Sequence, residues 1–188
     1  SIQDFHNALH DTGHFATTRP HYIEGLCRTT HFAECRAVVE SVDVLLHAPI
    51  TNKAMALAER AYAILHGERG ELIGNFTILH RELNSHTSII LEDIPQGESL
   101  ESAMLTMSQD KLLSGLKEFE ERMRRADISH NNLRKQNIVV DRNGYWHPIR
   151  LYYTTRGYGG DSRELETLCA ATKRVGPVDD CLNQPLSA

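Results

Sequence analysis

The fold is decided by the segment Ile128-Ser129-His130-Asn131-Asn132-Leu133-Arg134-Lys135-Gln136-Asn137-Ile138-Val139-Val140. Its mostly polar beginning and its β-branched end are typical of a loop that leads into a short buried strand. The turn-prone run 141–144 and the apolar stretch 145–151 come next. Together these patterns predict a β-hairpin directly after the loop.

Strands and one helix are expected before this segment. Alternating apolar residues predict short strands within 21–50, and further strands are expected near 72–81 and 88–93. Between them, residues 52–66 are rich in strong helix formers and predict a helix that Asn52 caps. The front of the chain is therefore expected to form a sheet with one helix.

Helices dominate the rest of the chain. Ser108 can cap a helix whose apolar residues recur at helical spacing, and Asp161 with Glu164 forms a capping-box-like pair that begins a last helix. The apolar stripe, which predicts core packing, comprises Leu112, Leu113, Leu116, Phe119 and Met123. We therefore expect an α+β chain with an N-terminal extension (1–20), a domain (21–176) and an irregular tail (177–188).

Composition limits the classes of function. The 188 residues carry a net charge of −5, with 40% hydrophobic and 24% charged residues, which is an ordinary globular balance. A general nucleic-acid binder would show a basic face. The basic residues Arg122, Arg124 and Arg125 stand beside Glu118, Glu120 and Glu121, which indicates a solvated helix face. We expect no nucleic-acid partner and, since no apolar run approaches about 20 residues, no membrane contact.

The four cysteines do not form a metal-binding or redox motif. Cys27, Cys35, Cys169 and Cys181 contain no C-x-x-C pair. Two disulfides remain possible, but a chain of this length does not need them for stability. Reduced thiols and a cytoplasmic location are favoured.

The quoted segment resembles the catalytic loop of protein kinases, His-Arg-Asp-Leu-Lys-x-x-Asn, which an apolar strand follows. His130, Leu133 and Asn137 match the family's His, Leu and Asn, whereas Asn132 stands at the catalytic Asp and Arg134 at the Lys. After the expected hairpin, Arg150-Leu151-Tyr152 stands where kinases carry Asp-Phe-Gly. The resemblance implies a structural role for His130, and Asp161 would match the buried Asp that supports this loop.

The upstream half also resembles a kinase. Residues 89–100 are similar to the fifth strand and hinge, which would place Leu91 as gatekeeper and turn the Glu92 carbonyl and the Ile94 amide toward an adenine. The 52–66 helix would be the regulatory helix with Glu59 as its acidic residue, and His47 would occupy the place of the phosphate-binding Lys. Glu59 pairs with His47 in this interpretation, or is simply an exposed carboxylate.

The resemblance implies a small antiparallel-sheet N-lobe (21–94) and a reduced, mainly helical C-lobe (95–176). Kinases use one Asp to accept a proton and another, with an Asn, to hold magnesium. Asn132 is neutral, and Arg150 would place a permanent cation at the metal position. We therefore expect a catalytically inactive kinase-like domain, a pseudokinase, which acts as a binding or regulatory module without a metal.

Weak, metal-independent nucleotide binding is the accompanying hypothesis, because Arg134 and Arg150 could hold an anion directly. The pocket would comprise Leu26, His47, Glu59, Leu91, Glu92, Ile94, Arg134, Asn137 and Arg150. The expected partners are proteins or other domains of a longer chain.

Three alternatives remain open. One is an atypical phosphotransferase or nucleotidyl transferase with a rearranged site that uses Asp141, Asp161 or Glu59. Another is a plain α+β domain with a fortuitous likeness to kinases. The third concerns the first residues, where His6, His10 and His14 are spaced as metal ligands on a helix, although an ordinary polar segment is favoured.

Overall fold

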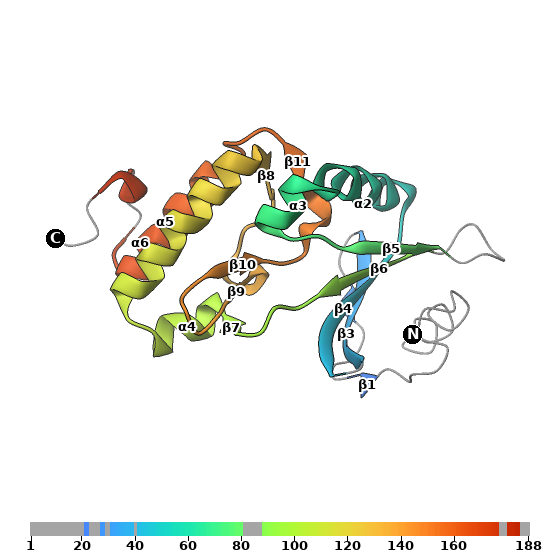
Figure 1. The fold of residues 1–188 in the computed structure, drawn as a ribbon, viewed down its shortest axis with the longest axis horizontal. Helices are drawn as coiled ribbons and strands as arrows, with labels where there is room; N and C mark the ends of the chain where they lie inside the picture. The colour runs from blue at the N-terminus through green and yellow to red at the C-terminus, as the bar shows by residue number, and fades with distance from the viewer. Residues whose placement is uncertain are drawn as a thin grey trace. The chain divides into compact units, whose positions relative to one another are not determined.

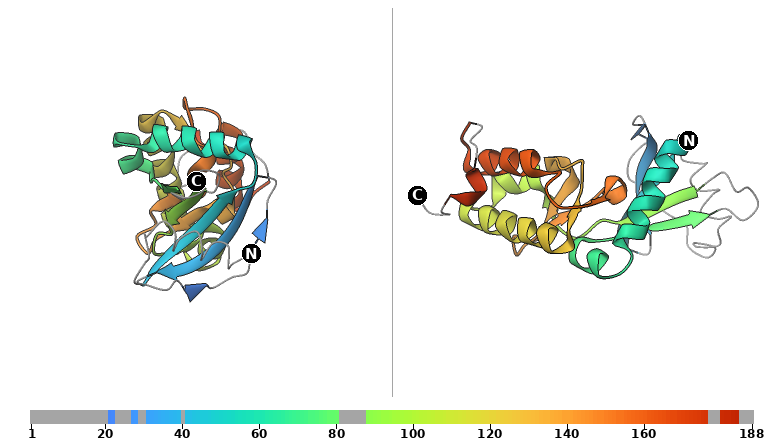
Figure 2. Two further views of the ribbon diagram at one scale, coloured as in Figure 1. Left: turned by 90° about the vertical axis from the view of Figure 1, so that its right-hand side faces the viewer. Right: turned by 90° about the horizontal axis from the view of Figure 1, so that it is seen from above.

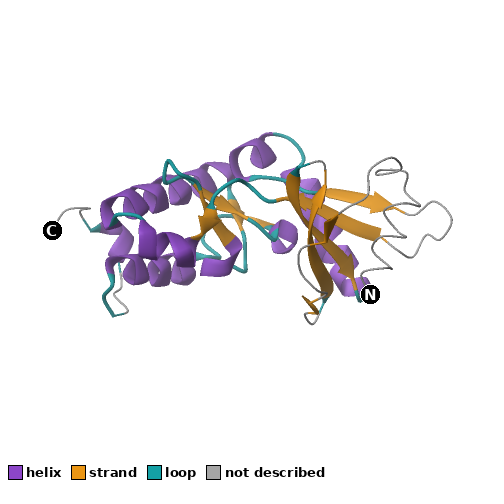
Figure 3. Cartoon of the chain, turned by 90° about the horizontal axis from the view of Figure 1, so that it is seen from below, coloured by secondary structure: helices purple, strands orange, loops and turns teal. Residues whose placement is uncertain are grey.

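The chain forms an α+β protein with an antiparallel sheet and several helices (Figure 1). The computed structural model describes residues 21–22, 27–28, 31–39, 41–80, 88–176 and 180–184. The chain divides into two compact units, which consist of residues 1–63 with 75–94 and of residues 64–74 with 95–188. Strands predominate in the first unit and helices in the second (Figure 3).

The first unit is built on an antiparallel sheet with the order β1-β3-β4-β6-β5, in which β2 also pairs with β3. The long hairpin β3–β4 places Glu34 directly opposite His47, and β6 places Ile90 on the other side of His47. The strands are β1 (His21–Tyr22), β2 (Cys27–Arg28), β3 (Phe32–Val39), β4 (Val42–Pro49), β5 (Thr77–His80) and β6 (Ser88–Asp93).

Both faces of this sheet are buried. Because side chains alternate along a strand, one face carries small and aliphatic residues and the other carries His47 with its neighbours. The apolar face is a cluster of Ala33, Cys35, Ala37, Val44, Leu46 and Ile89, against which Ala48 and Leu91 pack. Helix α2 (Asn52–Leu65) belongs to the same unit up to Ala63 and buries Ala54, Ala58 and Ala61 completely. Its cap is Thr51, whose hydroxyl accepts a hydrogen bond from the Ala54 amide, and not Asn52 as predicted.

The second unit combines helices with short strands. Its sheets have the orders β10-β9-β7 and β11-β8. The helices are α3 (Glu68–Ile73), α4 (Leu100–Thr106), α5 (Gln109–Ala126) and α6 (Ser162–Lys173), with the 3-10 turns η1 (Lys135–Asn137), η2 (Leu151–Tyr153) and η3 (Cys181–Asn183). The strands are β7 (Glu98–Ser99), β8 (Ile128–Ser129), β9 (Ile138–Val140), β10 (Trp146–Pro148) and β11 (Thr155–Arg156).

Helix α5 is the centre of the second core. Ser108 caps it as predicted, and its apolar stripe is buried. Phe119 stacks on Trp146 of the hairpin with ring centroids 6.1 Å apart. A Cβ at Gly115 would lie 2.1 Å from the Gly144 carbonyl oxygen, so only glycine permits this close approach. Helix α6 lies beside α5 (Figure 2, right).

Arg122 corrects the prediction of a solvated basic face, because its side chain is only 3% exposed. Its Nε donates to Glu118 at 2.7 Å, and its Nη1 donates to the Leu72 carbonyl at 3.0 Å. Its Nη2 donates to the Trp146 carbonyl, and the guanidinium lies 3.9 Å from the centroid of the Tyr145 ring. Arg122 therefore joins α3, α5 and the hairpin, while Arg124 and Arg125 are exposed as expected.

Two local predictions were wrong for related reasons. Helix α3 occupies the beginning of the expected strand 72–81, so β5 starts only at Thr77. Asp161 precedes α6 but makes no capping hydrogen bond to it, because its carboxylate binds backbone elsewhere. The Leu72 carbonyl of α3 binds Arg122, 50 residues away. Asp161 binds the His130 amide, 31 residues away, so both segments make contacts that local sequence patterns do not contain.

The cysteines also differ from expectation. Cys169 and Cys181 form a disulfide, so the prediction of reduced thiols was wrong for this pair, while Cys35 is a buried free thiol. The cytoplasmic location was predicted from reduced thiols, and the disulfide removes that basis. It also orders η3 within the tail that was expected to be irregular. Across the described ranges, no helix combines the length and apolarity needed to cross a membrane.

Candidate functional site

The loop 130–137 is held by His130, which is 1% exposed. Its Nε2 lies 2.8 Å from the Ile149 carbonyl oxygen, and its Nδ1 lies 3.1 Å from the Asn132 amide nitrogen. Since a carbonyl only accepts and an amide N–H only donates, the ring carries its proton on Nε2 and accepts at Nδ1. Both nitrogens are thus committed to backbone, which confirms the structural role predicted for His130.

Asp161, the residue before α6, holds the same loop. Its Oδ2 accepts a hydrogen bond from the His130 amide at 2.6 Å, and its Oδ1 accepts one from the Asn131 amide at 2.8 Å. The carboxylate is 3% exposed, and Asn131 adopts a left-handed backbone conformation with φ 70°. A buried carboxylate that receives two backbone amides fixes this turn firmly.

Asn137 and Arg150 meet through their side chains, and Asn132 joins them through its backbone carbonyl. The Arg150 Nη1 donates to the Asn137 Oδ1 at 2.8 Å and to the Gln136 carbonyl at 3.1 Å. The Asn137 Nδ2 donates in turn to the Asn132 carbonyl at 2.7 Å. Asn137 is buried, and Arg150 is half-buried with a left-handed backbone, φ 57°. The amide oxygen of Asn137 therefore faces a guanidinium.

Arg134 contributes backbone to this arrangement. Its carbonyl accepts a hydrogen bond from the Asn137 amide at 2.9 Å where η1 begins, and its side chain is exposed. With Arg150, it gives this part of the second unit two cations and two neutral amides, Asn132 and Asn137. Such groups can donate to an anion, but they provide no carboxylate for a proton or a divalent metal.

In the first unit, His47 is 0% exposed and lies beside two carboxylates. Its Nδ1 is 3.7 Å from the Glu34 Oε1, and its Nε2 is 3.5 Å from the Glu92 Oε1. Glu34 was not predicted, because only the β3–β4 register places it opposite His47. Glu59, the partner considered from sequence, is exposed on α2.

Within the first unit, Leu91 and the Ile94 amide do not take the places that the predicted pocket requires. Leu91 packs on the apolar face of the sheet, whereas His47 and Glu92 lie on the opposite face. The Ile94 amide donates a hydrogen bond to the Asp43 carbonyl at 2.8 Å. This donor is therefore satisfied within the protein and is not available to an adenine. Leu26 lies outside the described residues.

Metal ligands are not clustered in the parts of the chain that the structure describes, where no group of three or more His, Cys, Asp or Glu side chains is placed to hold an ion. His6, His10 and His14 fall outside these parts. Asp141, one of the alternative catalytic carboxylates, binds the Asn143 and Tyr145 amides and His147 within the hairpin.

No protein-family model matches the chain, and no curated protein matches its sequence.

Proposed function

We propose that the chain is a degenerate protein-kinase-like domain that binds and regulates and does not transfer phosphate. The observation that carries this proposal is the 2.8 Å hydrogen bond from the Arg150 guanidinium to the Asn137 amide oxygen. In the kinases that the sequence resembles, an Asn and an Asp hold magnesium at these two positions. Here the oxygen that would face the metal accepts from a fixed cation.

The charge of Arg150 opposes the binding of a metal ion at this position. Arg150 is charged at any physiological pH, and a divalent ion brought next to it would be repelled. Asn132, at the position of the proton-accepting Asp, has an amide and cannot take up a proton as a carboxylate does. Loss of both acidic groups removes proton acceptance and metal binding together, while a single loss could be compensated.

The scaffold of the loop is nevertheless retained. The buried Asp161 receives the His130 and Asn131 amides, which is the role of the supporting Asp in kinases. His130 is committed to backbone and cannot replace the missing base without releasing the loop. The loop has the supporting residues Asp161 and His130 but no Asp at positions 132 and 150. This combination favours a binding or regulatory role over catalysis.

The first unit supports the same proposal. His47, at the position of the phosphate-binding Lys, is enclosed and has a carboxylate near each ring nitrogen. It does not present a positive charge to a phosphate, as an extended lysine does. Nucleotide binding is therefore weak in this proposal and does not require magnesium, and the partners are proteins or other domains.

A turnover assay tests the proposal. We expect no release of ADP or inorganic phosphate from ATP above the buffer rate, with either magnesium or manganese. The matched control is Asn137→Ala, which removes the only retained metal-ligand candidate of the loop. Clear activity that disappears in Asn137→Ala would overturn the proposal in favour of an atypical phosphotransferase.

A further inference from the structure

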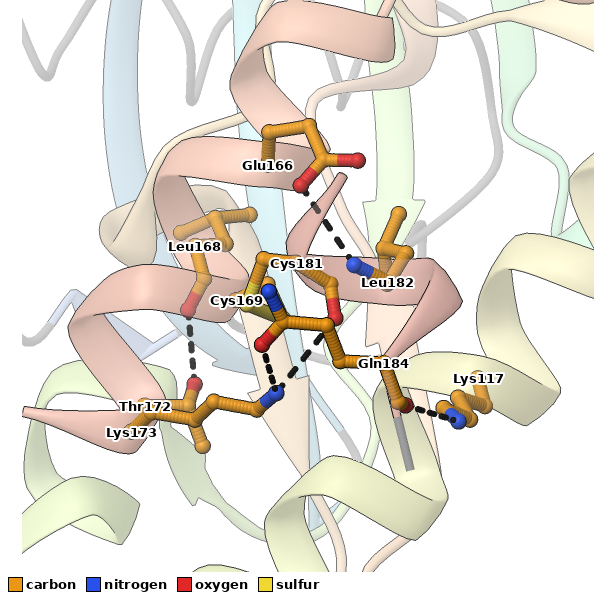
Figure 4. The surroundings of a disulfide bond; sticks show 9 residues. All are labelled: Lys117, Glu166, Leu168, Cys169, Thr172, Lys173, Cys181, Leu182 and Gln184. Carbon is orange, nitrogen blue, oxygen red and sulfur yellow. Dashed lines mark hydrogen bonds between the residues drawn. A yellow bond between two sulfur atoms is a disulfide. The ribbon is translucent and has the colours of Figure 1, made fainter. Parts of the chain in front are cut away.

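The Cys169–Cys181 disulfide joins α6 to η3 across a separation of 12 residues (Figure 4). Both cysteines are 1% exposed, so the bridge is enclosed by the second unit. Cys169 lies on the buried side of α6 with Leu165 and Leu168, and Cys181 begins η3. Solvent reductants therefore have little access to either sulfur.

The described polar contacts around the bridge are exposed or only part-buried. Lys173 Nζ donates to the Cys181 carbonyl and to Gln184 Oε1, both at 3.4 Å. Lys117 Nζ of α5 donates to the Gln184 carbonyl at 3.1 Å, and the Leu182 amide donates to Glu166 at 3.4 Å. Contacts of 3.4 Å are weak, and the Lys117 contact is exposed to solvent, so among the described contacts the covalent bond is the strongest link between residues 180–184 and α6.

Cys35 does not compete for this pairing. Burial, and secondarily the charge of Glu34, raises the pKa of the Cys35 thiol to about 12. Thiol–disulfide exchange requires a thiolate, which is scarce at neutral pH when the thiol pKa is so high. The bridge is thus protected from internal exchange with Cys35 as well as from solvent.

We propose that Cys169–Cys181 is a permanent structural clasp and that the protein works in a thiol-oxidising compartment. In its formation, the two thiols lose two protons and two electrons to a disulfide oxidant, which is reduced to two thiols. A glutathione-buffered compartment would keep both cysteines reduced before the fold encloses them. This inference does not depend on the proposed function.

The first test is the thiol state of the native protein. Cells that produce it are quenched in acid and unfolded with an alkylating agent, and the peptides are weighed without reduction. We expect the Cys169 and Cys181 peptides to be linked in nearly all copies, while Cys35 carries the alkyl group. Alkylation of both Cys169 and Cys181 in the native protein would overturn the proposal.

The second test measures the clasp itself. We expect Cys181→Ser to lower the thermal midpoint by about 5–10 °C and to accelerate amide exchange in 180–184. Reduction of the unfolded wild type, followed by refolding with a reductant, should give the same shift without any substitution. Cys35→Ala is the control that leaves the clasp intact. Unchanged stability and exchange in both the Cys181→Ser protein and the reduced wild type would contradict a structural clasp.

Discussion

Two carboxylates of the second unit perform the same task in different settings. Asp161 and Asp141 each accept hydrogen bonds from two backbone amides. Asp161 reaches back 30 residues and is 3% exposed. Asp141 reaches 2 and 4 residues ahead, and its side chain is 25% exposed. The first holds two distant segments together, and the second shapes only its own turn.

The difference lies in whether water can replace the hydrogen bonds that each carboxylate accepts. The amides of a solvated turn can bind water instead at little cost, whereas the buried His130 amide has no such substitute, and the Asn131 amide is partly shielded. The candidate site therefore rests on an interaction that is costly to lose. The following predictions separate the two settings.

Removal of the Asp161 carboxylate should have the largest effect. We expect Asp161→Ala to lower the free energy of unfolding by about 2–4 kcal/mol, because it leaves the buried His130 amide without a partner and removes the part-buried hydrogen bond of the Asn131 amide. Trp146, the single tryptophan, is buried in the second unit, so its fluorescence in a denaturant titration reports this loss. Exchange of the His130 and Asn131 amides should also accelerate.

The matched control is Glu164→Gln, which changes an exposed carboxylate in the first turn of the same helix. It should change stability by no more than about 0.5 kcal/mol. If Asp161→Ala proved no more destabilising than Asp141→Ala, the distinction between the two carboxylates would be lost.

Removal of the Arg150 side chain should have an intermediate effect. Arg150→Ala eliminates the hydrogen bonds to Asn137 and Gln136, which lie at the half-buried rim of the loop. We expect a loss of about 1–2 kcal/mol in the same titration. Arg156→Ala, which truncates an exposed arginine, should leave stability almost unchanged. Equal effects of the two substitutions would show that Arg150 does not support the loop.

Asp141→Ala should have the smallest effect, about 1 kcal/mol at neutral pH. Partial burial alone would raise the pKa of Asp141, but hydrogen bonds from His147 and from the Tyr145 and Asn143 amides outweigh it, so the pKa lies below the ordinary 3.8. A carboxylate whose pKa is lowered by folding stabilises the folded state at pH values above its ordinary pKa. This stabilisation is lost as the pH falls through the pKa of the folded state.

The difference between wild type and Asp141→Ala should therefore be full at pH 7 and shrink below about pH 4. Denaturant titrations at several pH values measure it, with Arg142→Ala as the control in the same turn. A difference that grew toward low pH would contradict the assigned hydrogen bonds.

The same contrast explains which parts of the fold the sequence could predict. Helix α5, its Ser108 cap and the hairpin depend on contacts within a few residues, and the structure confirms them. Arg122, the Asp161 carboxylate and the Cys169–Cys181 pairing depend on residues far along the chain. Composition and periodicity do not contain that information, so the environment of Arg122 and the disulfide were predicted wrongly. For Asp161 the capping role was wrong, while its contact with the loop was expected from the resemblance to kinases and not from periodicity.

The candidate site follows the same rule. The resemblance to the kinase catalytic loop implied that Asn132, Asn137 and Arg150 would lie close together. Arg150 contacts the Asn137 side chain, and Asn137 contacts the Asn132 carbonyl. The predicted pocket of the first unit required the correct face of each strand. Leu91 and His47 were assigned to one pocket, but a difference in strand face separates them.

The central claim is that Arg150 takes the place of a metal at the Asn137 side chain. Its most direct test is the NMR signal of the Asn137 side-chain amide group during addition of manganese and ATP. We predict that this signal keeps its width in the wild type and broadens in Arg150→Asp, which replaces the cation by a carboxylate. Selective broadening of the Asn137 signal in the wild type would contradict the claim.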